Sequence, residues 1–254
     1  MSLVDPAEAF LREGEDLYQQ WHRPEWLPTD PVSLVWELDS ADREVGAFLV
    51  ACLSLGRVNA IIAFAKKLLE RLSRPLAGAL RSLNPAQTAD LTADLTYRFF
   101  SSQKLAIWLT ATGDVLRRYD TLESALGETS DPWVRLENFA RHFHSHGDIG
   151  ILVPRPRTSS AFKRLNLFFR WMVRHDAIDP GGWSRVKPSE LLAPVDTHVL
   201  AWARAEGVTT RRQADRKACQ EITEFFRRFS PEDPLRWDFA LTRKGMSGQT
   251  TFWT

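Results

Sequence analysis

Hydrophobic residues recur at intervals of three and four along most of the chain, which is the spacing of one face of an α-helix. No convincing strand pair, internal repeat or low-complexity tract interrupts this pattern, so the sequence predicts an all-α fold in one domain, 1–254. The predicted helices cover residues 5–20, 42–55, 59–74, 85–91, 102–119, 133–146, 161–175, 197–206 and 212–229.

Some segments have a more particular pattern. The helix expected over 42–55 is apolar on nearly every side, which predicts that it is buried. The connector 21–32 is expected to be irregular because it contains Pro24, Pro28 and Pro31. The tail, 233–254, gives no clear assignment.

The helix expected over 161–175 (AFKRLNLFFRWMVRH) combines an apolar stripe with a cationic row. At about 100° per residue, Arg170 and Arg174 fall near the direction of Lys163, with Asn166 beside them. Such a row could follow the phosphates of a nucleic acid, or it could simply be a solvated face.

The cysteine content and the length of the apolar runs indicate where in the cell the protein is expected. Cys52 and Cys219 are the two cysteines, too few for a disulfide framework or for an iron–sulfur cluster. No signal-like apolar run opens the chain, and no stretch of eighteen apolar residues lacks a charge. We therefore expect a soluble, cytoplasmic protein with no membrane partner.

Charge is unevenly distributed. Residues 151–217 hold 13 Lys and Arg against 6 Asp and Glu, whereas the remainder holds 20 against 26. A local excess of this size suits a polyanion such as nucleic acid.

Asp196 is the leading candidate for chemistry. It follows Pro194 and Val195 and precedes an amphipathic run, so its carboxylate should cap a helix N-terminus and stay ionised. A carboxylate held this way could stabilise positive charge on a sugar carbon or deprotonate a nucleophile. An ordinary N-cap is the structural alternative.

The string PVDTHV, residues 194–199, resembles the motif of helix-hairpin-helix DNA glycosylases of the endonuclease III and archaeal 8-oxoguanine glycosylase type. The similarity extends back through KRLNLFFRWMVR, residues 163–174, to Asp179, Gly182 and Trp183, so the helix-hairpin-helix-like segment is 161–207. Over nearly its whole length the chain also resembles an uncharacterised bacterial family, the domain of unknown function 2400, notably at 44–58 and 233–246.

The glycosylase resemblance implies a two-lobed helical fold in which Asp196 is catalytic. It also implies a nucleophilic lysine in bifunctional members, for which Lys163 is our choice and Lys187, inside the hairpin, is the rival. The tight Gly-Val-Gly hairpin of endonuclease III is replaced here by a longer loop. The DNA-contacting residues implied are Arg164, Arg170, Arg174, Lys187, Gly181, Gly182 and His198.

The same resemblance suggests where a flipped base would be received. SLGRVN, residues 54–59, occupies the place that leads into the base pocket, which makes Arg57 and Asn59 pocket candidates. Trp171 and Trp183 are candidate groove residues that could stack on a base.

These observations predict a monomeric DNA glycosylase that acts on a damaged or modified base in a DNA duplex and needs no cofactor. A metal site at His142, His144 and His146 is not expected, because His144 points away from the other two on a helix. A non-catalytic nucleic-acid-binding module remains the alternative, and a helical scaffold for a protein partner is a third possibility.

Overall fold

The computed structural model describes residues 6–247, and over that range the chain is helical, with isolated β-bridges in place of strands. The all-α prediction is therefore confirmed. The α-helices are α1 (Pro6–Trp21), α2 (Val32–Trp36), α3 (Ser40–Leu53), α4 (Val58–Leu69), α5 (Leu76–Ser82), α6 (Pro85–Thr92), α7 (Ser102–Tyr119), α8 (Pro132–Arg141), α9 (Lys163–Val173), α10 (Thr197–Ala205), α11 (Arg216–Arg227) and α12 (Asp238–Met246). Short 3₁₀ helices are η1 (Pro24–Thr29), η2 (Ser124–Leu126), η3 (His142–His144) and η4 (Pro188–Glu190).

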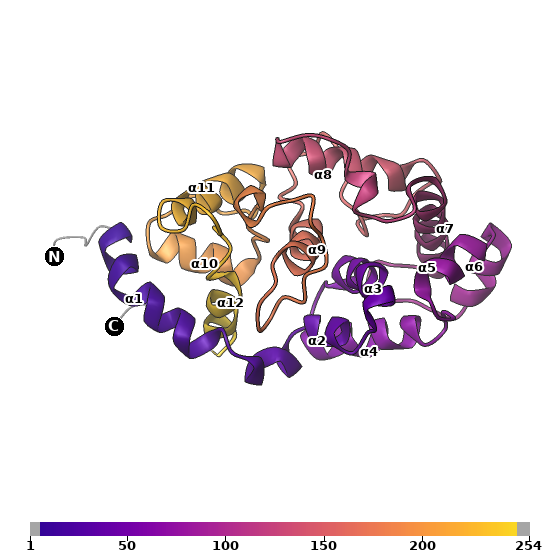
Figure 1. Cartoon of the computed structure of the whole chain (residues 1–254), viewed down its shortest axis with the longest axis horizontal. Coiled ribbons are helices and arrows are strands. Elements are labelled where there is room, and N and C mark those ends of the chain that lie inside the picture. The colour runs from indigo at the N-terminus through magenta and orange to yellow at the C-terminus, as the bar shows by residue number, and fades with distance from the viewer. Residues whose placement is uncertain (1–5, 248–254) are drawn as a thin grey trace.

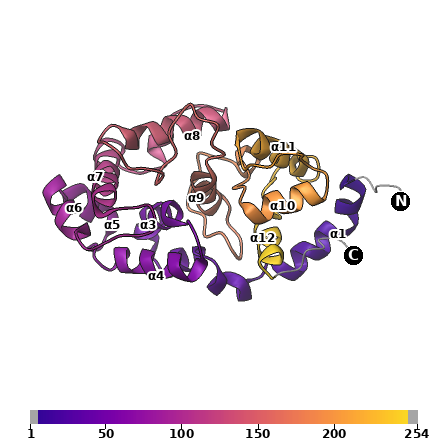
Figure 2. The same ribbon diagram turned by 180° about the vertical axis from the view of Figure 1, so that it is seen from behind.

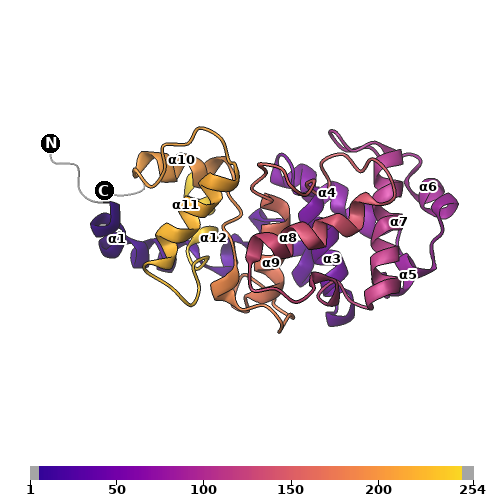
Figure 3. The same cartoon turned by 90° about the horizontal axis from the view of Figure 1, so that it is seen from above.

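The helices form an elongated molecule with α9 near its centre (Figure 1). Helices α3 to α8 lie at one end, and α10 to α12 lie at the other, where α1 packs against α12. The same arrangement is visible from behind (Figure 2) and from above (Figure 3). The first and last helices described therefore close the same end of the molecule.

Helix α3 is the centre of the larger end. It is buried along most of its length, as its all-round apolar sequence predicts, and it packs against α9. Its Phe48 ring contacts the rings of Trp108, Phe143 and Phe168 at centroid distances of 5.9, 4.8 and 5.4 Å. Aromatic packing of this kind fixes α9 relative to α3 and so positions the residues at the start of α9.

Several boundaries differ from the sequence prediction. The proline-rich connector is not irregular: it contains η1 and then α2, because Pro24 at the first helical position needs no N–H partner. The helix expected over 133–146 ends at Arg141 and tightens into η3. Part of the unassigned tail forms α12, and residues 248–254 lie outside the described residues.

No described helix is both long and apolar enough to cross a bilayer.

Candidate active site

The starts of α4, α9, α10 and α12 converge on a cleft of about 750 Å³. In Figure 3, α10 and α12 lie in the left half of the molecule, and α9 and α4 lie to the right of them. The polar side chains that line this cleft and matter for its chemistry are Arg57, Arg98, Lys163, Asp196, His198 and Asp238.

Asp196 caps α10, as its position before an amphipathic run predicts. Its Oδ1 accepts hydrogen bonds from the backbone N–H groups of His198 and Val199, both at 2.8 Å. Within residues 6–247, Oδ2 has no hydrogen-bond partner, and the half-buried side chain lines the cleft. One carboxylate oxygen is thus held by the helix, and the other is available to a ligand.

Lys163 is the first residue of α9 and lines the same cleft. The preceding Phe162 is in the left-handed region, at φ 52°, and its N–H donates to Ser160 Oγ at 3.1 Å. Lys163 is half-buried and has no ion-pair partner in the described part of the chain. The structure therefore brings the two candidate catalytic residues to one cleft.

The remaining cations of α9 are not an exposed row, which corrects the sequence interpretation. Arg170 and Arg174 are 2% and 4% exposed. Arg170 donates to Asp179 and Asp238, and Arg174 forms ion pairs with Asp179, Asp176 and Asp233. Burial of these guanidinium groups requires such partners, so both are held in internal ion pairs and do not form the exposed row that was predicted, although Arg170 borders the cleft.

Arg164 is also buried and lines the cleft, but its hydrogen bonds go to carbonyl groups. It donates to the carbonyl of Cys52, in the last turn of α3, at 2.8 Å, and to the carbonyl of Ile151. A cation in this position compensates the partial negative charge of the carbonyl groups at the C-terminus of α3. Its first role is structural, which again departs from the predicted phosphate contact.

The hairpin after α9 uses its backbone donors internally. Gly181 and Gly182 have positive φ angles of 67° and 135°, and Gly181 N–H donates to the carbonyl of Trp171 at 2.9 Å. The N–H groups of Ser184 and Arg185 donate to Glu123 Oε1 at 2.6 and 2.7 Å. These donors are consequently occupied by the chain itself and not free for a phosphate.

The two tryptophans of the predicted groove are buried. Trp171 is fully enclosed, and Trp183 donates from Nε1 to Glu44 at 2.8 Å while packing on Phe168 and Phe169. Neither lines the cleft. Lys187 is exposed but also lies outside the cleft, so the structure does not place it with Asp196.

Arg57 is exposed at the N-cap position of α4 and lines the cleft, whereas the exposed Asn59 does not. His198 lines the cleft from α10 and packs against α12. A Cβ added to Gly245 of α12 would lie 3.0 Å from the Cβ of His198. Of the predicted pocket and DNA-contacting residues, four thus line the cleft with Asp196: Arg57, His198, and the internally bonded Arg164 and Arg170.

Arg98 was missed by the sequence analysis. It occupies a tight turn closed by hydrogen bonds between Tyr97 and Phe100, in the left-handed region at φ 53°. Its side chain crosses to Gly56, where a Cβ would lie 2.8 Å from Arg98 Nη1, and the φ of 113° at Gly56 is one that favours glycine. No local sequence signal marks this approach.

Apart from Asp196 and His198, the ionisable groups lining the cleft are either paired acids and bases or cations without a carboxylate partner among the described residues. Arg243 pairs with Asp30 at 3.0 Å, and Arg170 pairs with Asp238. Arg57, Arg98 and Lys163 have no carboxylate partner among the described residues. Together with the adjoining helix N-termini, they favour an anionic ligand.

Asp238 is a further carboxylate of the cleft, and the sequence analysis missed it. Burial raises its pKa to about 6, and the nearby charge of Asp196 adds to this effect. Because Asp238 stands at the start of α12 in the unassigned tail, its neighbours could not be read from the sequence.

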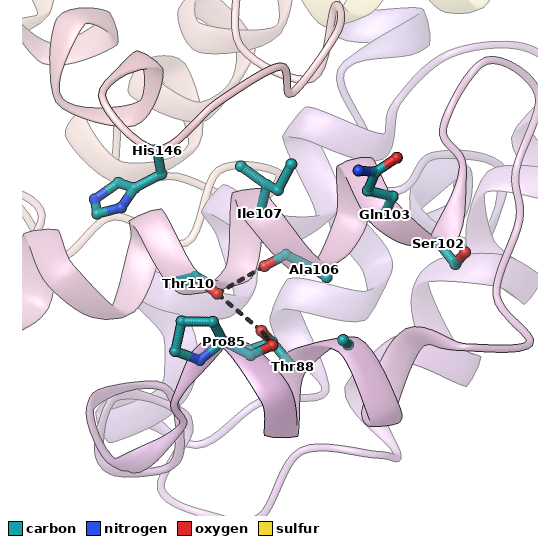
Figure 4. A pocket seen from close by; sticks show the side chains of 9 residues that line it. Pro85, Thr88, Ser102, Gln103, Ala106, Ile107, Thr110 and His146 are labelled. Carbon is teal, nitrogen blue, oxygen red and sulfur yellow. Dashed lines mark hydrogen bonds between the residues drawn. The ribbon is translucent and has the colours of Figure 1, made fainter.

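A separate cavity of about 400 Å³ lies between α6 and α7 (Figure 4). Its floor holds Thr88 and Thr110, whose hydroxyl groups are 2.8 Å apart, and His146 stands at its edge. Neither lysine nor arginine is among the described residues that line it. It therefore offers no cation for a phosphate and no carboxylate like Asp196.

Fold and site together define an all-α protein with a cationic cleft that contains a helix-capping carboxylate. The family model described as "Protein of unknown function (DUF2400)" matches residues 30–247, so the chain belongs to this family. No curated protein and no solved structure matched the chain.

Proposed function

We propose that the protein is a DNA glycosylase that receives a damaged or modified base in the cleft and cuts its N-glycosidic bond. The observation that carries this proposal is that Asp196 and Lys163, which lie on different helices, line one cleft whose other unpaired side chains are cationic. A simple helix cap would not need a lysine and a phosphate-attracting surface beside it.

In this proposal Asp196 stabilises the positive charge that develops on the sugar as the base departs with the bonding electrons. Lys163, once deprotonated, attacks the sugar C1′ and forms a Schiff base after the sugar ring opens. Arg57 and Arg98 contact phosphates on either side of the target nucleotide. Next to Arg98, the 64% exposed ring of Phe99 is suited to stacking against bases as the target leaves the helix.

Lys163→Gln is expected to abolish borohydride trapping of a covalent DNA adduct, because glutamine cannot form the reducible Schiff base. Lys187→Gln, which changes an exposed lysine outside the cleft, should trap as much DNA as the wild type. Trapping can be measured by gel mobility after borohydride is added to protein and labelled DNA. Adduct that persists in Lys163→Gln and disappears in Lys187→Gln would transfer the role to the hairpin.

DNA affinity is expected to fall steeply with salt because bound cations release counterions from the phosphates. Arg57→Gln and Arg98→Gln should each reduce the slope of log K against log salt by about one. Lys66→Gln, on the exposed face of α4 outside the cleft, should leave the slope unchanged. If Arg57→Gln and Arg98→Gln both kept the wild-type slope, as Lys66→Gln should, the cleft would not be a phosphate-binding site.

The second candidate function is a non-catalytic nucleic-acid-binding module with the same cleft. The observation that favours it is that Arg57, Arg98 and Lys163, which line the cleft without a carboxylate partner among the described residues, could bind phosphates without any chemistry. A module of this kind would retain the salt dependence but would neither excise a base nor form the covalent adduct.

A further inference from the structure

Asp238 is a buried carboxylate in the cleft for which the proposed chemistry has no use. It is the first residue of α12, is 5% exposed, and lines the cleft together with Asp196. Helices α10 and α12, which carry these two residues, pack against each other. A second acid buried this close to the first needs a partner to balance its charge.

The partner is Arg170, which is shared between two carboxylates. Its Nη1 donates to Asp238 Oδ2 at 2.5 Å, and its Nε donates to Asp179 Oδ1 at 3.1 Å. Asp179 is fully buried and also accepts from Arg174. Arg170 is therefore neutralised by Asp179 and Asp238 together, and Asp238 is the one of these two acids that borders the cleft.

We infer that Asp238 is a positioning residue that acts through Arg170 to set the charge beside Asp196; the inference rests on the proposed function. When Asp238 is ionised, it neutralises Arg170, and the charge of Asp196 is available to a cationic sugar. When Asp238 takes up a proton, the positive charge of Arg170 is less compensated and opposes that sugar.

Other charged groups surround this pair. Asp196 and His198 line the same cleft from α10, Asp179 binds Arg170 from the hairpin, and Arg243 of α12 lines the cleft and pairs with Asp30. Because burial and the charge of Asp196 raise the pKa of Asp238 to about 6, its proton is taken up just below neutral pH. Excision should then fall as the pH falls, and DNA affinity should rise, since the cleft becomes more positive.

The coupling can be measured without a substrate by a carbon-13 NMR titration of the aspartate carboxyl groups of the full chain. We expect one carboxyl with a midpoint near 6, absent in Asp238→Asn and shifted to lower pH in Asp196→Asn. Asp94→Asn, which changes an exposed acid that pairs with Arg71 outside the cleft, should retain that midpoint. If Asp238→Asn does not fold, the shift of the carboxyl midpoint in Asp196→Asn still tests the inference. An unchanged midpoint in Asp196→Asn would overturn the inference.

The pH profile of excision supplies the functional readout. Wild-type excision should fall about tenfold between pH 7 and pH 5, the loss of ionised form expected for a pKa near 6. Excision by Asp238→Asn should be slow and should lose the part of this decline that has a midpoint near 6, whereas His198→Gln should retain that part. A decline that persists in Asp238→Asn and vanishes in His198→Gln would assign it to the histidine and refute the inference. Absence of excision together with the NMR shift would refute the proposed function but leave the charge coupling intact.

Discussion

Replacing Asp196 with asparagine is expected to slow base excision about a hundredfold while leaving the free energy of unfolding nearly unchanged. Asparagine caps helices about as well as aspartate, so the hydrogen bonds from the N–H groups of His198 and Val199 can persist. The lost negative charge no longer stabilises the cationic sugar, which costs about 3 kcal/mol in the transition state. Single-turnover excision and urea unfolding measure the two effects.

A matched control is available at the start of α8. Asp131 caps that helix with the same geometry, accepting from the N–H groups of Trp133 and Val134 at one oxygen, and it lies outside the cleft. Asp131→Asn should therefore excise at the wild-type rate. Equal excision by Asp196→Asn and Asp131→Asn would reduce Asp196 to a helix cap.

Asp179→Ala is expected to destabilise the protein by about 3–5 kcal/mol, the usual cost of leaving a buried charge without its partner. Asp179 is fully buried and accepts hydrogen bonds from both Arg170 and Arg174. Alanine would leave two buried guanidinium groups with fewer partners. Chemical denaturation of the purified variant measures the loss.

The control for this prediction is Asp94, which forms an exposed ion pair with Arg71. Exposed pairs contribute little because water screens them, so Asp94→Ala should unfold close to the wild-type midpoint. A small effect of Asp179→Ala, similar to that of Asp94→Ala, would show that the network behind the cleft is not essential for stability.

The long periodic helices could be predicted because a local pattern determines them. Helix α7, Ser102–Tyr119, has the predicted bounds, and α10 begins at Thr197 after the predicted cap. Helices α2 and α5 have 5 and 7 residues, too few to show a period. Helix α12 begins without a capping side chain, so no start signal marks it.

The candidate site was predictable only where its residues lie near a motif. Asp196 belongs to PVDTHV, and Lys163 begins the helix that resembles the glycosylases. The helical spacing of Arg170 and Arg174 suggested a surface row, but each has a partner far away in sequence, Asp238 at 68 residues and Asp233 at 59, besides the nearby Asp179. Pairing between residues far apart in sequence helps decide which cations are buried. The local periodicity of a helix gives no information about such partners.

The most direct test of the central claim is the affinity for a DNA duplex in which the target nucleotide is a cationic pyrrolidine, compared with a neutral tetrahydrofuran. This comparison needs no knowledge of the base. If Asp196 stabilises a cationic sugar in the cleft, the wild type should bind the pyrrolidine duplex about a hundredfold more tightly, and Asp196→Asn should lose that preference. Equal affinity of the wild type for both duplexes, or a preference that survives in Asp196→Asn, would contradict the account.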